Sequence, residues 1–192
     1  MRLATAMRKD TGVYPGNGVV GRERPQWYSV GKLPIISGRI SVADLGAIPG
    51  PDAVCVRVPI GDHLVEARLI DFNGSLCLSR VRARDAGAKP SFGPQIGQVS
   101  VDFGAVAIAD LDAIRATLTD DDEDDLAELT GEMMGRFGEI VHLKFGCRSV
   151  RFAVCQSGFG DGTFPVFALK AGRRVIGIEV EFICDGHILR KR

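Results

Sequence analysis

Apolar residues recur at every second position along most of this chain, in short runs separated by Gly and Pro. The clearest run is Ala53–Val58, in which Val54, Val56 and Val58 alternate with a cysteine and an arginine. A period of two is typical of a β-strand that buries one face. Runs of strand length occur at Ile35–Val42, Ala53–Val58, His63–Ile70, Leu76–Arg84, Gln98–Ala109, Ile140–Lys144, Ser149–Cys155, Thr163–Leu169 and Val175–Ile183. Short connections between successive strands favour antiparallel pairing.

Two pairs of these strands are predicted to form β-hairpins. Ala53–Val58 and His63–Ile70 flank a Gly-Asp turn, and Thr163–Leu169 and Val175–Ile183 flank a basic corner. Two strands that flank a short turn usually pair with each other. Asp85–Gly97 is rich in Gly and Pro, so we expect a loop there.

Helical periodicity appears only after residue 109. Asp110 is predicted to cap a short helix in which Leu111, Ile114 and Leu118 share one face. Thr119 is predicted to cap a second helix, with acidic residues in its first turn where they suit the helix dipole. The sequence therefore predicts a mainly β (β-rich α+β) fold, an antiparallel sandwich or barrel-like sheet with a two-helix insert around 110–137.

The first 34 residues contain many Gly and Pro residues, which argues against a long regular element. We expect residues 1–32 to form an arm packed on the body through Trp27 and Tyr28, and residues 33–192 to form a single β-rich domain. As an alternative, Trp27 stacks on a ligand, since an exposed aromatic pair can cover a sugar or a base.

The charge balance and the cysteines of the chain indicate its expected partners and cellular compartment. The 192 residues include 24 Lys and Arg and 24 Asp and Glu, so no net charge favours nucleic acid. No apolar run has the length of a membrane span, and the N-terminus lacks the apolar core of a secretion signal. Five cysteines without close pairing indicate thiols in a reducing compartment. We expect a cytoplasmic protein that needs no cofactor, and we expect Arg80, Arg82 and Arg84 to lie on a solvated strand face.

Two groups of residues are candidates for chemistry. Gly158, Gly160 and Gly162 surround Asp161, but a strand follows them instead of the helix of a phosphate-binding loop, so we expect a tight turn. Asp102, Asp110 and Asp161 can hold Mg²⁺ or Ca²⁺ if the loop of Asp161 folds over the other two. As an alternative, these three carboxylates cap a helix and turns.

Several segments resemble one bacterial family of uncharacterised proteins, domain of unknown function 4241. Ser157-Gly-Phe-Gly-Asp-Gly-Thr-Phe-Pro-Val resembles its Ser-Gly-x-Gly-Asp-Gly-x-Tyr-Pro-Val signature, with Phe164 where the family usually has Tyr. Ser37–Asp44, Pro59–Val65, Val101–Gly104 with Asp110, and Gly177–Phe182 are similar to other segments of the family in the same order. The resemblance implies a single bacterial cytoplasmic domain. It marks as candidate binding residues Asp44, Asp102, Asp110, Gly158, Gly160, Asp161 and Gly162.

Two functional hypotheses follow. The first is a non-enzymatic protein-binding module, for example an immunity protein that neutralises a bacterial toxin; the acidic run Asp120–Asp125 would meet a basic partner. The second is a divalent-cation-dependent enzyme or small-ligand binder that uses Asp102, Asp110 and Asp161. The unpaired edges of the predicted hairpins also allow two copies of the chain to pair as a homodimer.

Overall fold

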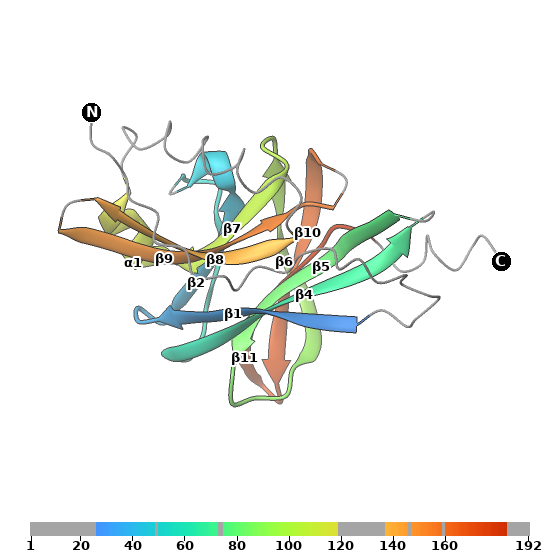
Figure 1. The fold of residues 1–192 in the computed structure, drawn as a ribbon. Helices are drawn as coiled ribbons and strands as arrows, with labels where there is room; N and C mark the ends of the chain where they lie inside the picture. The colour runs from blue at the N-terminus through green and yellow to red at the C-terminus, as the bar shows by residue number, and fades with distance from the viewer. Residues whose placement is uncertain are drawn as a thin grey trace.

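Two antiparallel sheets make up the protein, as the computed structural model shows (Figure 1). It describes residues 26–48, 50–72, 75–118, 137–145, 147–158 and 160–183. The six-stranded sheet has the order β1 (Gln26–Ile35), β4 (Gly61–Phe72), β5 (Ser75–Asp85), β11 (Arg174–Glu181), β10 (Gly162–Ala171) and β6 (Ser91–Val101). The five-stranded sheet has the order β3 (Val54–Arg57), β2 (Arg39–Asp44), β7 (Ala105–Asp110), β9 (Arg148–Gln156) and β8 (Gly138–Phe145). The predicted mainly β, antiparallel, sandwich-like fold is confirmed.

The two sheets bury a shared core between their facing sides. Every second residue of the strands points inward, so the alternation seen in the sequence becomes this core. The six-stranded sheet contributes Leu33, Ile35, Val65, Val81, Val99 and Ile178, and the five-stranded sheet contributes Ile40, Val42, Val106 and Ile108. In Figure 1, β1 runs across the direction of β10 and β11 of the same sheet, so this sheet twists strongly over its width.

A second apolar cluster covers the outer face of the five-stranded sheet. Helix α1 (Leu111–Thr117) packs Ile114 there, close to Leu143 and Phe152. The predicted cap is confirmed, because the Asp110 carboxylate accepts hydrogen bonds from the amides of Asp112 and Ala113. The second predicted helix lies over residues 119–136, outside the described residues. Neither α1 nor the short 3₁₀ helix η1 (Leu45–Ala47) has the length and apolar character to traverse a bilayer.

One predicted hairpin is confirmed and the other is wrong. β10 and β11 pair with each other, as expected. β3 pairs instead with β2, whereas β4 pairs with β1 and β5 in the other sheet. The chain crosses between sheets at Val58–Ile60, where the Val58 amide bonds the Gly38 carbonyl, and Gly61 already belongs to β4. A turn signal shows where the chain bends but not which sheet it enters.

Two further predictions around β6 are wrong. The predicted strand Gln98–Ala109 is divided at Asp102–Gly104, where the chain turns from β6 in one sheet into β7 in the other, with Gly104 at a φ of 64°. The predicted loop Asp85–Gly97 contains the first half of β6, which begins at Ser91. Pro94 is tolerated in this strand because β6 lies at the edge of its sheet.

The N-terminal boundary also differs from the prediction. Residues 26–35 form the regular strand β1, so the boundary expected at residue 33 falls inside a strand. β1 pairs with β4 over almost its full length, and this pairing tolerates Gly31 at an irregularity in the register. Residues 1–25 lie outside the described residues.

The outer face of the six-stranded sheet carries a ladder of ion pairs. Arg80 bonds Glu179 and Glu181, and Arg82 and Arg84 both bond Glu66. These arginine side chains are each only 15% exposed, so the expectation of a freely solvated arginine stripe is wrong. Burial raises the pKa of Glu179, whereas for Glu66 the opposing effect of its two arginine bonds outweighs burial and lowers the pKa. The Arg82 guanidinium lies 3.7 Å from the centre of the Trp27 ring.

Candidate functional site

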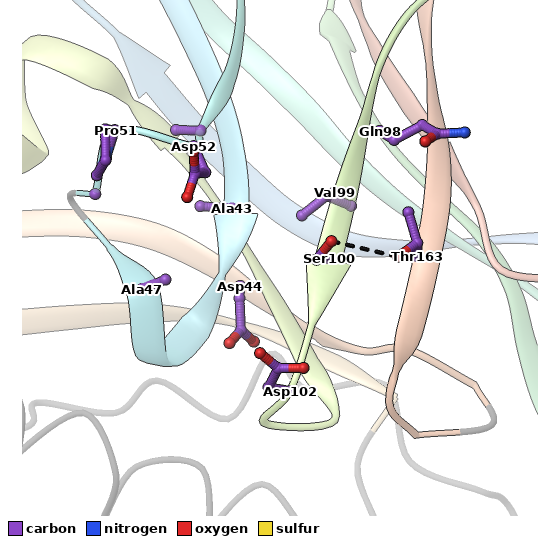
Figure 2. Close-up of a pocket in the computed structure, with 12 residues that line it drawn as sticks. Ala43, Asp44, Ala47, Pro51, Asp52, Gln98, Val99, Ser100, Asp102 and Thr163 are labelled. Atoms are coloured by element: carbon purple, nitrogen blue, oxygen red, sulfur yellow. Dashed lines mark hydrogen bonds between the residues drawn. The ribbon is translucent and has the colours of Figure 1, made fainter.

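A cleft of about 410 Å³ opens between the edge of the six-stranded sheet and the end of β2 (Figure 2). One wall is formed by the second half of β6 and the first residues of β10. The other wall is formed by the end of β2, helix η1 and the loop that leads into β3. The lining residues are Ala43, Asp44, Ala47, Gly50, Pro51, Asp52, Ala53, Gln98, Val99, Ser100, Asp102 and Thr163. The cleft therefore lies along the seam where the two sheets do not close on each other.

Asp44 is the buried carboxylate of this cleft. It ends β2 and is 5% exposed, and its Oδ1 accepts a hydrogen bond of 3.4 Å from the Phe103 amide. Figure 2 shows its side chain beside that of Asp102. Burial raises the pKa of Asp44. Hydrogen bonds from the backbone of Asp102 and Phe103 oppose this rise only in part, and the negative charge of Asp102 adds to it. A positively charged group bound next to Asp44 would therefore stabilise its ionised carboxylate.

Two exposed carboxylates, two hydroxyls and the Gln98 amide are the other polar groups of the lining. Asp102 and Asp52 lie on opposite walls and are exposed. The Ser100 and Thr163 hydroxyl oxygens are 3.3 Å apart across β6 and β10. Among the described residues that line the cleft there is no Lys, Arg or His. Three negative charges thus face this cavity without a positive lining side chain.

Close packing of two turns holds Asp44 and Asp102 together. The Phe103 ring lies against Gly46 of η1, where a Cβ atom would stand 2.4 Å from the ring. Behind this turn, the Gly104 carbonyl accepts a hydrogen bond of 3.0 Å from the Ser157 amide. A side chain at position 46 would clash with the Phe103 ring and require that ring to move.

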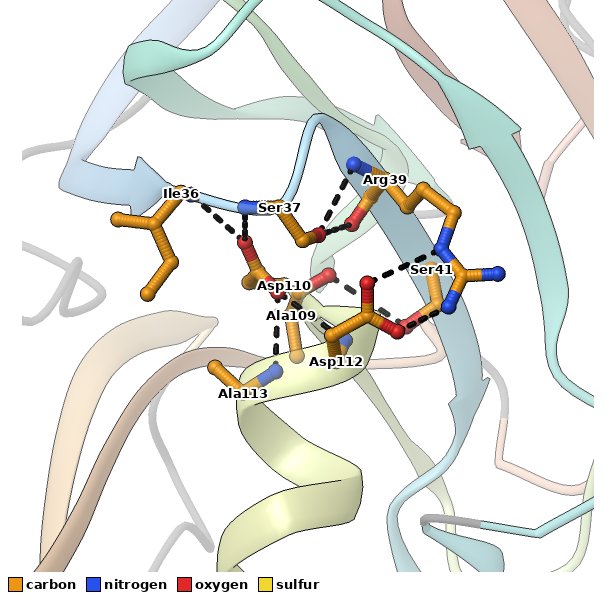
Figure 3. A network of polar contacts seen from close by, with 8 residues as sticks. All are labelled: Ile36, Ser37, Arg39, Ser41, Ala109, Asp110, Asp112 and Ala113. Carbon is orange, nitrogen blue, oxygen red and sulfur yellow. Dashed lines mark hydrogen bonds and ion pairs between the residues drawn. The ribbon is translucent and has the colours of Figure 1, made fainter.

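Asp110, predicted as a metal ligand, instead accepts hydrogen bonds from backbone amides through both of its carboxylate oxygens (Figure 3). Its Oδ2 accepts hydrogen bonds of 2.7 Å from the amides of Ile36 and Ser37. Its Oδ1 accepts bonds of 3.1 and 3.0 Å from the amides of Asp112 and Ala113. One buried carboxylate thus caps α1 and fixes the turn between β1 and β2. These four donors assign Asp110 a structural role.

The three carboxylates predicted to bind a metal do not come together. Asp102 precedes β7 and Asp110 is its last residue, and the six residues of this strand span about 20 Å at ~3.3 Å per residue. Asp161 is exposed at the start of β10. Among the described residues no group of three His, Cys, Asp or Glu side chains is placed to hold a metal ion. The predicted set is therefore corrected to Asp44, Asp52 and Asp102 as the acidic residues that share a cleft.

The glycine loop has the geometry of a tight turn, as expected. Gly158 and Gly160 have φ values of 76° and 93°, and the Ser157 hydroxyl donates to the Gly160 carbonyl. A Cβ atom at Gly158 would stand 2.4 Å from the Leu78 carbonyl oxygen, so the loop lies directly against β5. Gly162 begins β10, one residue before the Thr163 of the cleft. The loop thus supports the cleft wall without lining it.

Of the predicted site residues, Asp44 and Asp102 line the cleft, and Trp27 is stacked on Arg82 at the far edge of the sheet. Sequence reasoning missed Asp52, Ser100 and Thr163. Their local patterns contain no signal, because their proximity comes from the way the two sheets meet.

Comparison with protein-family models, with curated proteins and with solved structures found no match for this chain. The resemblance to the bacterial family described above stays a prediction. The segments that carry the resemblance contact one another: the Ser37 turn bonds Asp110, Asp44 bonds the Asp102-Phe103 turn, and Ser157 bonds Gly104.

Asp44→Asn is expected to raise the free energy of unfolding at pH 7 by about 0.5–2 kcal/mol. A folded-state pKa above the ordinary value of about 3.9 means that the Asp44 carboxyl stabilises the fold fully below pH ~3.9. This contribution is lost as pH rises through the folded pKa, so the gain from Asn should be small at pH 4 and larger at pH 7. Urea unfolding at both pH values measures it.

The exposed Asp62→Asn variant serves as the control, because it removes one negative charge outside the cleft. It should shift stability by a similar small amount at both pH values. If the change in the free energy of unfolding depended on pH in the same way for both variants, the ionised Asp44 carboxylate would not destabilise the fold.

Proposed function

We propose that this chain is a non-enzymatic protein-binding module whose acidic cleft receives a basic side chain of its partner. The observation that supports the proposal is the buried Asp44 carboxylate, held beside Asp102 in a cavity with no positive lining residue in the described part of the chain. A cationic group placed between the two would offset both the burial of Asp44 and its repulsion by Asp102.

The spacing of the acids favours an organic cation over a bare metal ion. A Ca²⁺ ion needs six to eight oxygens at about 2.3–2.6 Å, and no described cluster of three acidic, His or Cys groups offers that. A guanidinium group carries five N–H donors on a planar frame and reaches several carboxylates at hydrogen-bond distance. Asp52 on one wall and Asp102 on the other suit such a group.

The cellular context of the proposal is a bacterial cytoplasm. One version is an immunity protein that binds a toxin through a basic residue of that toxin, which agrees with a domain of this size and with four described cysteines that are free thiols. The predicted acidic run Asp120–Asp125 lies outside the described residues. The cleft offers a second acidic surface for a basic partner.

Binding of N-acetyl-arginine amide tests this proposal. Titration followed by amide chemical shifts should perturb residues of the cleft, and the neutral analogue N-acetyl-citrulline amide should perturb them at least tenfold less. Asp52→Asn should weaken binding about three- to tenfold, because one carboxylate partner is lost, and added NaCl should weaken it further.

Asp62→Asn is the matched control, since it changes the net charge equally on another surface and should bind like the wild type. Shifts spread over the whole surface, or an equal response to citrulline amide, would contradict a specific basic-residue site.

A further inference from the structure

We propose that the partner segment binds as an added β-strand along the free edge of β6, with its basic side chain in the cleft. This inference rests on the proposed function and adds the conformation of the ligand. It concerns the second half of β6, Gly97–Val101, and the cleft residues that face it.

The cleft follows the backbone edge of β6. Gln98, Val99 and Ser100 are consecutive and all line it, although Val99 points to the core and its two neighbours are exposed. Side chains of successive strand residues lie on opposite faces of a sheet. The feature that these three residues share is therefore the strand edge, with its backbone N–H and C=O groups. A ligand in the cleft meets that edge.

This edge is not hydrogen-bonded to another strand in the described part of the chain, although β2 and β3 of the other sheet pass close to β6. β6 is the last strand of its sheet and pairs on one side only, with β10. An unpaired strand edge is a template for another extended chain. The facing wall consists of the end of β2, η1 and the loop at 50–53. Because β2 pairs with β3 and β7 and not with β6, it does not use these backbone groups of β6.

The two halves of β6 differ in how well the edge is protected. The first half contains Pro94, and its register with β10 is interrupted on both sides of Phe167. Both features discourage strand addition. The second half pairs with β10 without interruption from Gly97 to Val101 and has no proline. The regular half is thus the one that faces the acidic cleft.

Charge and length define the occupant. β6 has no charged residue among its eleven, so the edge itself does not repel a second chain. Val54 of β3 packs against the inner face of β6 at Gly97, where a Cβ atom would lie 2.9 Å from the Val54 Cγ2. From there to Asp102 the edge accommodates a segment of about five residues, or ~16 Å. Asp44, Asp52 and Asp102 select a Lys or Arg on the side chain that points into the cleft.

A displayed heptapeptide library selected on the wild-type protein provides the probe. We expect enrichment of Arg or Lys at one position, and loss of that enrichment when the selection is repeated on Asp52→Asn but not on Asp62→Asn. The best peptide is then synthesised in two N-methylated forms, each methylated at alternate residues and offset from the other by one.

Strand addition predicts a clear difference between the two forms. Backbone N–H groups of an extended strand point alternately to its two sides, so one form loses its hydrogen bonds to β6 and the other keeps them. One form should bind at least tenfold more weakly than the other, and amide exchange of Gln98–Val101 should slow on binding of the unmethylated peptide.

Each contrary result has a distinct meaning. Equal affinity of the two methylated forms, with the basic preference retained, would overturn strand addition and leave the proposed function standing. A selection without any basic preference would overturn both. A concentration-dependent dimer in sedimentation that the peptide dissociates would assign the β6 edge to a second copy of the chain and overturn the proposed occupant.

Discussion

Replacing Asp110 with alanine is expected to lower the free energy of unfolding by about 3–5 kcal/mol. The variant loses the cap of α1, typically worth about 1–2 kcal/mol. It also removes the acceptor of the partly buried Ile36 and Ser37 amides, at about 1–1.5 kcal/mol for each hydrogen bond. Equilibrium unfolding in urea measures the sum, and the midpoint should fall with little change in slope.

Two control variants separate this network from a charge effect. Asp112→Ala breaks an exposed ion pair with Arg39 and should cost far less stability than Asp110→Ala. Asp110→Asn keeps the shape but turns an amide NH₂ toward one pair of N–H donors, so it should remain strongly destabilising. An Asp110→Ala protein as stable as Asp112→Ala would show that the four hydrogen bonds contribute little.

Gly158→Ala is expected to lower the free energy of unfolding by about 2–5 kcal/mol, for a different reason. At a φ of 76° an L-residue is disfavoured by about 1–2 kcal/mol. The added methyl group would also stand 2.4 Å from the Leu78 carbonyl oxygen, and such overpacking costs about 1–3 kcal/mol. Thermal unfolding followed by circular dichroism measures the loss.

Gly160→Ala is the matched control, because Gly160 also has a positive φ but has no atom within 4 Å of the added Cβ. It should cost only the conformational part, about 1–2 kcal/mol. Equal losses for the two variants would mean that contact with β5 does not constrain the loop.

The local elements could be predicted from the sequence because they depend on neighbouring residues. Val54 and Val56 alternate with exposed positions in β3, and Ile114 and Leu118 lie on the buried face of α1 and just after it. The pairing of strands could not be predicted in the same way. The chain passes between sheets at Val58–Ile60 and at Asp102–Gly104, and no local pattern distinguishes a turn within one sheet from a crossing between two.

The candidate site follows the same division. The segments that resemble the bacterial family predict Asp44 and Asp102 as site residues, and both line the cleft. The same resemblance predicts Asp110 as a site residue. β7 instead places Asp110 at its far end, where both carboxylate oxygens accept hydrogen bonds from backbone amides. The sequence does not single out Asp52 as a site residue, since a single acidic residue after a proline-glycine loop is common. Its partners become visible only when β2 and β6 are placed side by side.

The strand order of the six-stranded sheet has a consequence for synthesis on the ribosome. β6 joins its sheet only through β10, and β10 and β11 lie between β6 and β5 although they are made last of the six strands. A nascent chain that ends before residue 162 therefore carries β6 with both edges unpaired. The final hairpin must pair with β5 on one side and with β6 on the other, a step that depends on contacts distant in sequence and is therefore slow. During that interval both edges of β6 are open to other chains, including the nascent chains of neighbouring ribosomes.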